Sequence, residues 1–221
     1  MLTLFHCMSA RSFRPLWTLE ELGLPYELRM LPFPPRMHAR DYLQTNPLGT
    51  VPALYDGEVA MTESAAMCQY LATRDGPTAL AVAPGDPEYG GFLNWLHFGE
   101  ATLTFPQTIV LRYGRFEPPE RRLPQAAEDY RKWFLARLKG LIPVLSRRPY
   151  LCGEQLTVAD ISVGYALMLA DYLGLAGQFP AAVQDYWARL QTGAGYQRAL
   201  AAQLRAAQEQ GVSTTPAPLV A

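Results

Sequence analysis

Cysteine and histidine are scarce in this chain, whose 221 residues include three of each at wide spacings. An odd number of scattered cysteines does not fit a disulfide framework, and so few potential ligands do not fit a zinc site. We therefore expect neither structural disulfides nor a metal cofactor.

Long apolar runs and dense clusters of one charge are missing as well. No stretch of roughly 20 apolar residues is present to span a bilayer. The formal net charge is -1, and no basic cluster is dense enough to neutralise many phosphates. The chain passes from Met1 into a β-rich run without the charged and apolar regions of a signal peptide. These absences predict a cytoplasmic protein that binds neither nucleic acid nor membranes.

What is present is an ordinary globular composition, 49% hydrophobic, in a chain long enough for two modest domains. Strand-like and helix-like patterns alternate in the first third, and strand-helix-strand order predicts a parallel pair with a right-handed crossover. The expected elements are a strand at 2–6, a helix beginning near Phe13 and ending at Gly23, a strand at 26–31, a short helix, a strand after Pro52, a turn at Asp56-Gly57, a strand at 58–61 and a helix at 64–74. This βαβ-α-ββα order is the thioredoxin-like arrangement.

The rest of the chain reads as helical. Prolines and glycines punctuate a stretch without periodicity, which indicates a linker. The segment that begins at Val158 is apolar nearly all round and should form the buried centre of a helical bundle. Thr157 and Asp160 make a capping box at its start, which gives Asp160 a structural role. We expect a thioredoxin-like domain at 1–76, a linker at 77–88, an all-helical domain at 89–210 and a mobile tail at 211–221.

A proline interrupts the strand pattern between Asn46 and Leu54. Because Pro52 cannot donate to a sheet ladder, it must lie at the first residue or the edge of a strand. The N–H and C=O groups of Thr50 and Val51 are then expected to be free to pair with an extended peptide, as in recognition by strand addition.

An apolar helix opens at Ser64, with Glu63 beside it. The hydroxyl of Ser64 and the first backbone N–H groups of this helix are expected to face outward as an anion site. An open backbone, an N–H cluster for a carboxylate and an acid for an ammonium group together suit a small zwitterionic peptide.

These two motifs resemble the glutathione site of the cytosolic glutathione transferase superfamily, and the resemblance extends over about residues 2–205. It implies a thioredoxin-like domain followed by an all-α bundle, glutathione as co-substrate, a small electrophile as second substrate, a detoxifying role and a homodimer. It also implies that a cis Val51–Pro52 bond presents the cysteinyl backbone and that Glu63 and Ser64 hold the γ-glutamyl group.

A glutathione transferase must produce a thiolate at neutral pH, because the thiolate attacks the electrophile. Ser9 lies between the first strand and the first helix, where tau- and zeta-like transferases keep a catalytic serine. Zeta enzymes have Ser-Ser-Cys where this chain has Ser9-Ala10-Arg11, which argues against their isomerase activity. Ser9 is our candidate catalytic residue, with Ser12 or backbone N–H groups as the alternatives.

Cys7 raises the alternative of redox chemistry. Glutaredoxins and omega-like transferases place a nucleophilic cysteine where this chain has Ser9, and beta-like transferases place theirs at Ala10. Cys7 is out of register with both positions. We expect it to be a partly buried thiol.

Two parts of the site are less defined by the resemblance. Many relatives bind the glycyl carboxylate of glutathione with a lysine or glutamine at the position of Thr50, which cannot pair a charge. The candidates that could substitute for it are Arg36, His38 and Arg40, with Gln44 as a neutral option. The electrophile pocket is expected between the domains, near Phe105 and Tyr113.

The sequence therefore predicts a glutathione transferase that conjugates glutathione to a small hydrophobic electrophile. The alternatives are a glutathione-dependent isomerase or lyase, a thiol-disulfide oxidoreductase, and a non-catalytic glutathione- or ligand-binding protein.

Overall fold

The structure is a computed structural model that describes residues 1–219. The chain forms two compact units, which we describe separately. The first contains residues 1–78 and 191–219, and the second contains residues 79–190.

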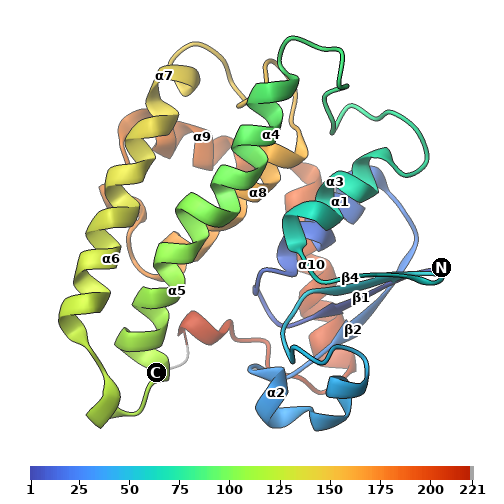
Figure 1. Cartoon of the computed structure of the whole chain (residues 1–221), viewed down its shortest axis with the longest axis vertical. Coiled ribbons are helices and arrows are strands. Elements are labelled where there is room, and N and C mark those ends of the chain that lie inside the picture. The colour runs from blue at the N-terminus through green and yellow to red at the C-terminus, as the bar shows by residue number, and fades with distance from the viewer. Residues whose placement is uncertain (220–221) are drawn as a thin grey trace. The chain divides into compact units, whose positions relative to one another are not determined.

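A four-stranded sheet lies at the centre of the first unit, in the order β2-β1-β3-β4 (Figure 1). The strands are β1 (Leu2–His6), β2 (Tyr26–Met30), β3 (Ala53–Asp56) and β4 (Val59–Met61). β1 and β2 are parallel, whereas β1 with β3 and β3 with β4 are antiparallel. The parallel pair forms because a helix crosses over between β1 and β2, and the β3–β4 hairpin turns at Gly57, whose φ is 59°.

Four helices accompany this sheet: α1 (Phe13–Leu22), α2 (Pro35–His38), α3 (Ser64–Thr73) and α10 (Ala194–Glu209). Gly23 ends α1 in the left-handed conformation, and its N–H bonds the carbonyl of Leu19. α1 buries Phe13, Leu16 and Trp17, packs against α3 and α10, and brings both rings of its Phe13–Trp17 pair onto Tyr196. The predicted βαβ-α-ββα thioredoxin-like order is confirmed.

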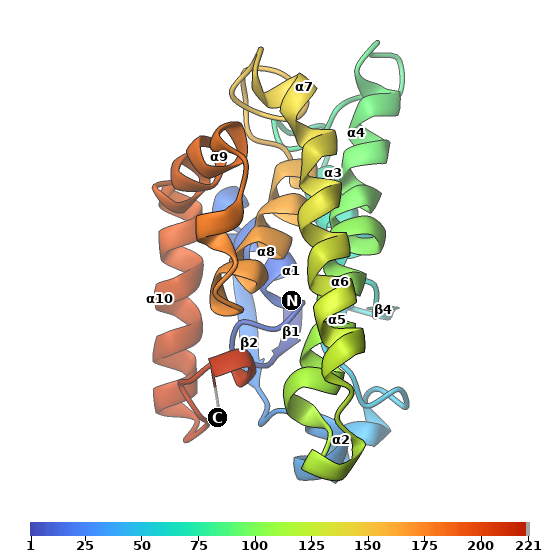
Figure 2. The ribbon, with the colours of Figure 1, turned by 90° about the vertical axis from the view of Figure 1, so that its left-hand side faces the viewer.

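The first unit also contains a helix from the far end of the sequence. α10 lies alongside β2, where Ala206 and Ala207 pack on Met30 (Figure 2). Gln210 strengthens this contact because its side chain accepts a bond from the N–H of Met30 at 2.8 Å and donates to the carbonyl of Leu28 at 2.8 Å. The first unit is thus larger than the 1–76 domain expected from sequence.

The second unit is helical. Its helices are α4 (Tyr89–His97), α5 (Phe105–Leu111), α6 (Pro124–Arg137), α7 (Ile142–Leu145), α8 (Val158–Tyr172) and α9 (Ala181–Gln191), with π-helical turns at Phe98–Thr104 and Arg112–Phe116. Thirteen consecutive residues of α8 are buried, from Val158 to Ala170, as its apolar sequence predicts. The capping box of Thr157 and Asp160 is present, and Asp160 also accepts bonds from the N–H of Leu151 and the hydroxyl of Tyr186, both at 2.8 Å. The structural role predicted for Asp160 is confirmed.

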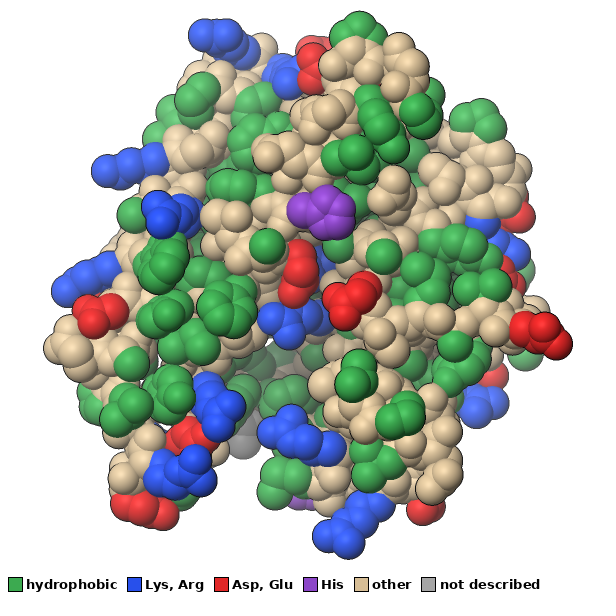
Figure 3. Space-filling model, in the orientation of Figure 1, with side chains coloured by type: hydrophobic (Ala, Val, Ile, Leu, Met, Phe, Trp, Pro, Cys, Tyr) green, Lys and Arg blue, Asp and Glu red, His purple; other side chains and the backbone are tan. Residues whose placement is uncertain are grey.

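Part of the predicted tail is structured. Ala217–Leu219 forms a 3-10 turn, and Pro216 and Pro218 are buried, while residues 220–221 lie outside the described residues. Within residues 1–219, no helix has the length and apolar character needed to cross a membrane. Lys and Arg side chains are spread among acidic and apolar ones on the face seen in Figure 3.

Candidate functional site

Three chain segments meet at the carboxyl end of β1. Phe5 pairs with Ala53 in the antiparallel β1–β3 ladder, so the residues just before Ala53 lie beside the residues that follow β1. The N-terminus of α3 is tied to the same region, because Nη1 of Arg14 on α1 donates to Oγ of Ser64 at 3.0 Å. The strand register brings the Val51–Pro52 segment beside the loop that holds Ser9. The Arg14–Ser64 bond joins the start of α3 to the helix that follows this loop.

Ser9 lies in a tight turn, closed by a bond from the N–H of Ala10 to the carbonyl of Cys7 at 3.0 Å. Its φ is 52°, and it is the one non-glycine with a positive φ among the described residues. Only 1% of Ser9 is exposed. Its Oγ accepts a bond from Nε2 of Gln203 at 3.1 Å.

Ser12, an alternative to Ser9 as thiol activator, and Cys7, the candidate for redox chemistry, are both buried. The hydroxyl of Ser12, at the N-cap position of α1, lies 2.7 Å from Nδ1 of His6, and both residues are fully buried. Cys7 is also buried, and burial raises the pKa of its thiol to about 12. Cys7 was expected to be partly buried and is fully buried, and a thiol with so high a pKa stays protonated at neutral pH.

The Val51–Pro52 peptide bond is cis, as predicted. The expectation that the backbone of Thr50 is free is wrong for its carbonyl, which accepts bonds from the hydroxyl of Tyr42 at 2.7 Å and from Nδ2 of Asn46 at 2.8 Å. These two bonds hold the loop around Thr50 in place. Val51 differs, because neither its N–H nor its C=O has a hydrogen-bond partner within residues 1–219.

The start of α3 also departs from expectation. Glu63, the N-cap residue, is exposed, as a group that binds an ammonium should be. Ser64 was expected to turn its hydroxyl outward, but only 3% of this residue is exposed and its Oγ bonds Arg14. The cause is the fully buried Arg14 on the facing side of α1, which needs hydrogen-bond acceptors inside the protein. The first N–H groups of α3 remain the candidate anion-binding groups at this helix end.

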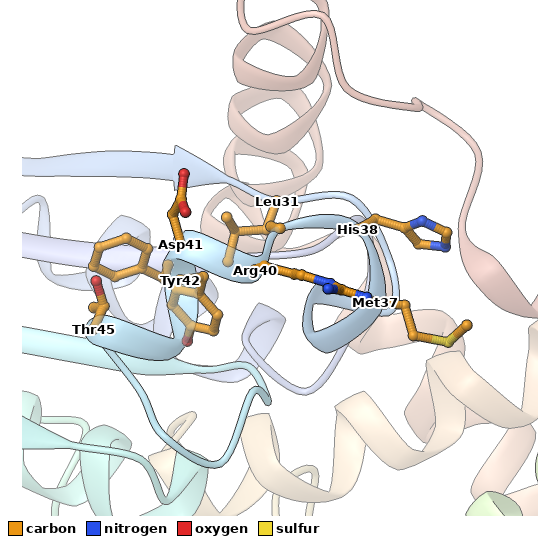
Figure 4. A pocket seen from close by; sticks show the side chains of 9 residues that line it. Leu31, Met37, His38, Arg40, Asp41, Tyr42 and Thr45 are labelled. Carbon is orange, nitrogen blue, oxygen red and sulfur yellow. The ribbon is translucent and has the colours of Figure 1, made fainter.

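The three basic candidates occupy two different places. His38 and Arg40 line an open hollow of about 580 Å³ that also includes Phe5, Leu31, Met37, Ala39, Asp41, Tyr42 and Thr45. Figure 4 shows His38 extending away from Tyr42 and Thr45. Arg36 instead lies against the loop before Thr50, since a Cβ placed on Gly49 would be 2.7 Å from the Cβ of Arg36. The Cβ of Arg36 thus packs beside Gly49, the residue that precedes Thr50.

The two aromatic candidates belong to the second unit. Phe105 is the first residue of α5 and is 52% exposed. Tyr113 is half-buried in the π-helical turn that follows α5, with the guanidinium of Arg112 5.7 Å from the centre of its ring.

Three buried polar residues of the first unit were not predicted from the sequence. Gln203, His6 and Arg14 are each at most 1% exposed. Gln203 lies among Ala199, Ala202 and Ala206 on the buried face of α10, and Arg14 lies between apolar residues of α1. A polar residue on an otherwise apolar helical face was the available signal for both. Within the described part of the chain, no group of three His, Cys, Asp or Glu side chains could hold a metal ion.

Comparison with known proteins gives a consistent result. A family model described as the N-terminal domain of glutathione S-transferase matches residues 8–74. Glutathione S-transferase 3 of Schizosaccharomyces pombe is 34% identical over 185 residues, which cover 78% of this chain and 76% of the relative.

Two solved structures extend the similarity to the fold. One is a ternary complex of BphK, a bacterial GST, with a TM-score of 0.79 and 29% identity, covering 91% of this chain and 98% of that one. The other is Ure2p5 from Phanerochaete chrysosporium, cocrystallized with 1-(S-glutathionyl)-2,4-dinitrobenzene, with a TM-score of 0.79 and 25% identity over 94% of this chain and 96% of that one.

Proposed function

Because the chain belongs to the glutathione S-transferase family, we propose that it joins the thiolate of glutathione to a small hydrophobic electrophile. The observation that carries this proposal is the backbone of Val51, which has no hydrogen-bond partner within residues 1–219 and lies beside the Ser9 loop. An extended peptide bound there would gain both backbone hydrogen bonds of Val51.

The polar ends of glutathione fit the groups around Val51. The first N–H groups of α3 would bind the carboxylate of the γ-glutamyl residue, and the exposed Glu63 would bind its ammonium group. Ser64 contributes as the residue that Arg14 fixes at this helix end. Arg36, beside Gly49, is the preferred partner for the glycyl carboxylate, ahead of His38 and Arg40 in the neighbouring hollow.

The thiol of glutathione must be activated, since a free thiol has a pKa of about 8.5. A hydroxyl that donates to the sulfur, together with the positive end of the α1 dipole, would stabilise the thiolate. Ser9 is proposed as this donor. Ser12 is a weaker candidate because its hydroxyl lies 2.7 Å from Nδ1 of His6, which can accept its proton, whereas the bond from Gln203 to Ser9 uses only the oxygen of that hydroxyl.

The remaining features of the proposal concern the second substrate and the assembly. Phe105 and Tyr113 are proposed to line the electrophile pocket. The structural neighbour Ure2p5 was cocrystallized with a dinitrophenyl conjugate of glutathione, which supports an aromatic electrophile as the first compound to test. We further propose a cytoplasmic, homodimeric enzyme with a detoxifying role.

The experiment compares the wild type, Ser9→Ala and Cys7→Ser. With a reactive aryl halide at about pH 6.5, Ser9→Ala should lower turnover roughly 10-fold, the effect of losing one hydrogen bond to a charged group. Glutathione affinity, measured by calorimetry, should barely change because Val51, Glu63 and the start of α3 remain. Cys7→Ser should keep its activity.

The other outcomes each favour a different function. An inactive Cys7→Ser with a normal Ser9→Ala, together with disulfide reductase activity of the wild type, would replace the transferase with a redox enzyme. Glutathione binding without turnover of any electrophile tested would favour a binding protein.

A further inference from the structure

The side-chain amide of Gln203 is the centre of a buried polar cluster that joins α10 to the Ser9 loop. Its Oε1 lies 2.9 Å from the backbone N of Ser9 and 2.9 Å from Nε2 of His6, and its Nε2 lies 3.1 Å from Oγ of Ser9. Ser12 completes the cluster through Nδ1 of His6. All four residues are at most 1% exposed, so bulk water does not compete for these bonds.

The direction of each hydrogen bond near Ser9 follows from one backbone group. The N–H of Ser9 can only donate, so the Gln203 atom that faces it must be the oxygen. The amide nitrogen of Gln203 therefore faces Oγ of Ser9, and an amide nitrogen can only donate. Oγ of Ser9 accepts this bond, and the proton of the Ser9 hydroxyl is left to point toward a different acceptor.

The oxygen of Gln203 also fixes the tautomer of His6. Its Nε2 lies against the accepting oxygen of Gln203 and must carry the hydrogen, so Nδ1 accepts from the hydroxyl of Ser12. Burial lowers the pKa of His6 to about 4, which keeps the imidazole neutral at neutral pH. The cluster therefore has one set of bond directions and no net charge near neutral pH.

We propose that Gln203 is a positioning residue that aims the hydroxyl proton of Ser9 at the sulfur of bound glutathione. This inference rests on the proposed function, since it assumes that Ser9 donates to that sulfur. Gln203 forms hydrogen bonds with both the backbone N–H and the hydroxyl of Ser9. It thus holds Ser9 in its left-handed conformation, and its amide nitrogen donates to a lone pair of the Ser9 hydroxyl oxygen. Part of the thiol-activating device is therefore supplied by the last helix, 194 residues away in sequence.

A double-mutant cycle tests whether Gln203 acts through Ser9. Gln203→Met keeps the length of the side chain but makes neither bond. It should raise the pKa of bound glutathione and lower turnover roughly 5- to 10-fold, with glutathione affinity changed less than about 2-fold. In the Ser9→Ala background the same substitution should change turnover less than about 2-fold, because the group it positions is gone.

A control on the same helix separates positioning from helix docking. Gln210→Met removes another bridge from α10 to the sheet, the one to Met30 and Leu28, and should leave the thiol pKa unchanged. If Gln203→Met does not fold, Gln203→Glu keeps the shape but presents only acceptors, so it would take the Ser9 proton and lower turnover as well. Equal losses from Gln203→Met with and without Ser9 would overturn the positioning role.

A measurement without glutathione separates this proposal from the proposed function. The ¹⁵N NMR shifts of His6 in the wild type should report the tautomer with hydrogen on Nε2, and hydrogen on Nδ1 would overturn the bond directions. A wild type that binds no glutathione would overturn the proposed function and the role of Gln203 with it. An active wild type matched by Gln203→Met would overturn the positioning role alone.

Discussion

Ser9 is held in a backbone conformation that glycine would adopt at lower cost. Its φ of 52° places it in the left-handed region, which costs a residue with a Cβ roughly 1–2 kcal/mol. The Cys7–Ala10 turn and two bonds between Ser9 and Gln203 help to maintain it. A non-glycine residue in such a position points to a use for its side chain, and the hydroxyl is the only functional group that serine adds.

Comparing Ser9→Gly with Ser9→Ala separates the cost of this conformation from the value of the hydroxyl. Both variants lose the hydroxyl, so both should lose turnover to the same extent. Ser9→Gly should be more stable than Ser9→Ala by about 1 kcal/mol, because only glycine adopts this φ without strain. Urea unfolding and aryl halide turnover measure the two effects, and equal stability of the two variants would show that the turn relaxes without cost.

At the scale of elements, the sequence predicts what is local and misses what is not. Gly23 ends α1, the Asp56-Gly57 turn forms the hairpin and Ser64 begins α3, because each signal acts within a few residues. The bond between Gln203 and Ser9 joins two residues whose separation no periodicity reveals. The same limit explains why Ser64 was expected to face outward, since its partner Arg14 lies 50 residues earlier.

The π-helical turn at Phe98–Thr104 brings its backbone against α8. A Cβ at Gly99 would lie 2.4 Å from Oγ of Ser162 and 2.5 Å from its carbonyl carbon, closer than atoms can pack. The hydroxyl of Ser162 on α8 also donates to the carbonyl of Leu96 on α4 at 2.7 Å. This bond limits how far α8 and α4 can move apart to make room for a Cβ. The close approach therefore depends on a glycine at position 99.

Gly99→Ala should accordingly lower the free energy of unfolding by about 3 kcal/mol, the upper part of the range for overpacking. Gly90→Ala is the matched control, since Gly90 is an exposed residue of α4 and a Cβ placed on it would meet nothing within 4 Å. This control should raise stability by about 0.5–1 kcal/mol through helix propensity. Urea unfolding followed by circular dichroism compares them. If Gly99→Ala lowers the free energy of unfolding no more than an ordinary surface substitution does, α8 shifts to accommodate the added methyl group.

At the scale of the whole molecule, the first unit depends on α10, a helix that lies far along the sequence from the sheet. α10 contributes Tyr196 to the aromatic contacts of α1, Ala206 and Ala207 to the packing on β2, and Gln203 to the cluster around His6. The stability of the first unit is thus coupled to the protonation of His6, which this helix helps to bury.

The pH dependence of stability follows from the difference between folded and unfolded His6. Burial lowers the pKa of His6 from 6.5 to about 4, whereas in the unfolded chain it keeps its ordinary value. As the pH falls below about 6.5, the unfolded state takes up a proton that the folded state does not, so the free energy of unfolding decreases. The loss should reach about 3 kcal/mol near pH 4 and then level off.

Urea unfolding of the wild type and His6→Gln between about pH 7.5 and pH 4 isolates this contribution. Glutamine can still donate to Gln203 but does not titrate, so the stability of the wild type should fall more steeply than that of the variant. The comparison between the two proteins is needed because burial raises the pKa of Asp160, which opposes the trend in both. Parallel pH profiles would mean that His6 is protonated in the folded state, and that the cluster around Gln203 accommodates a charge.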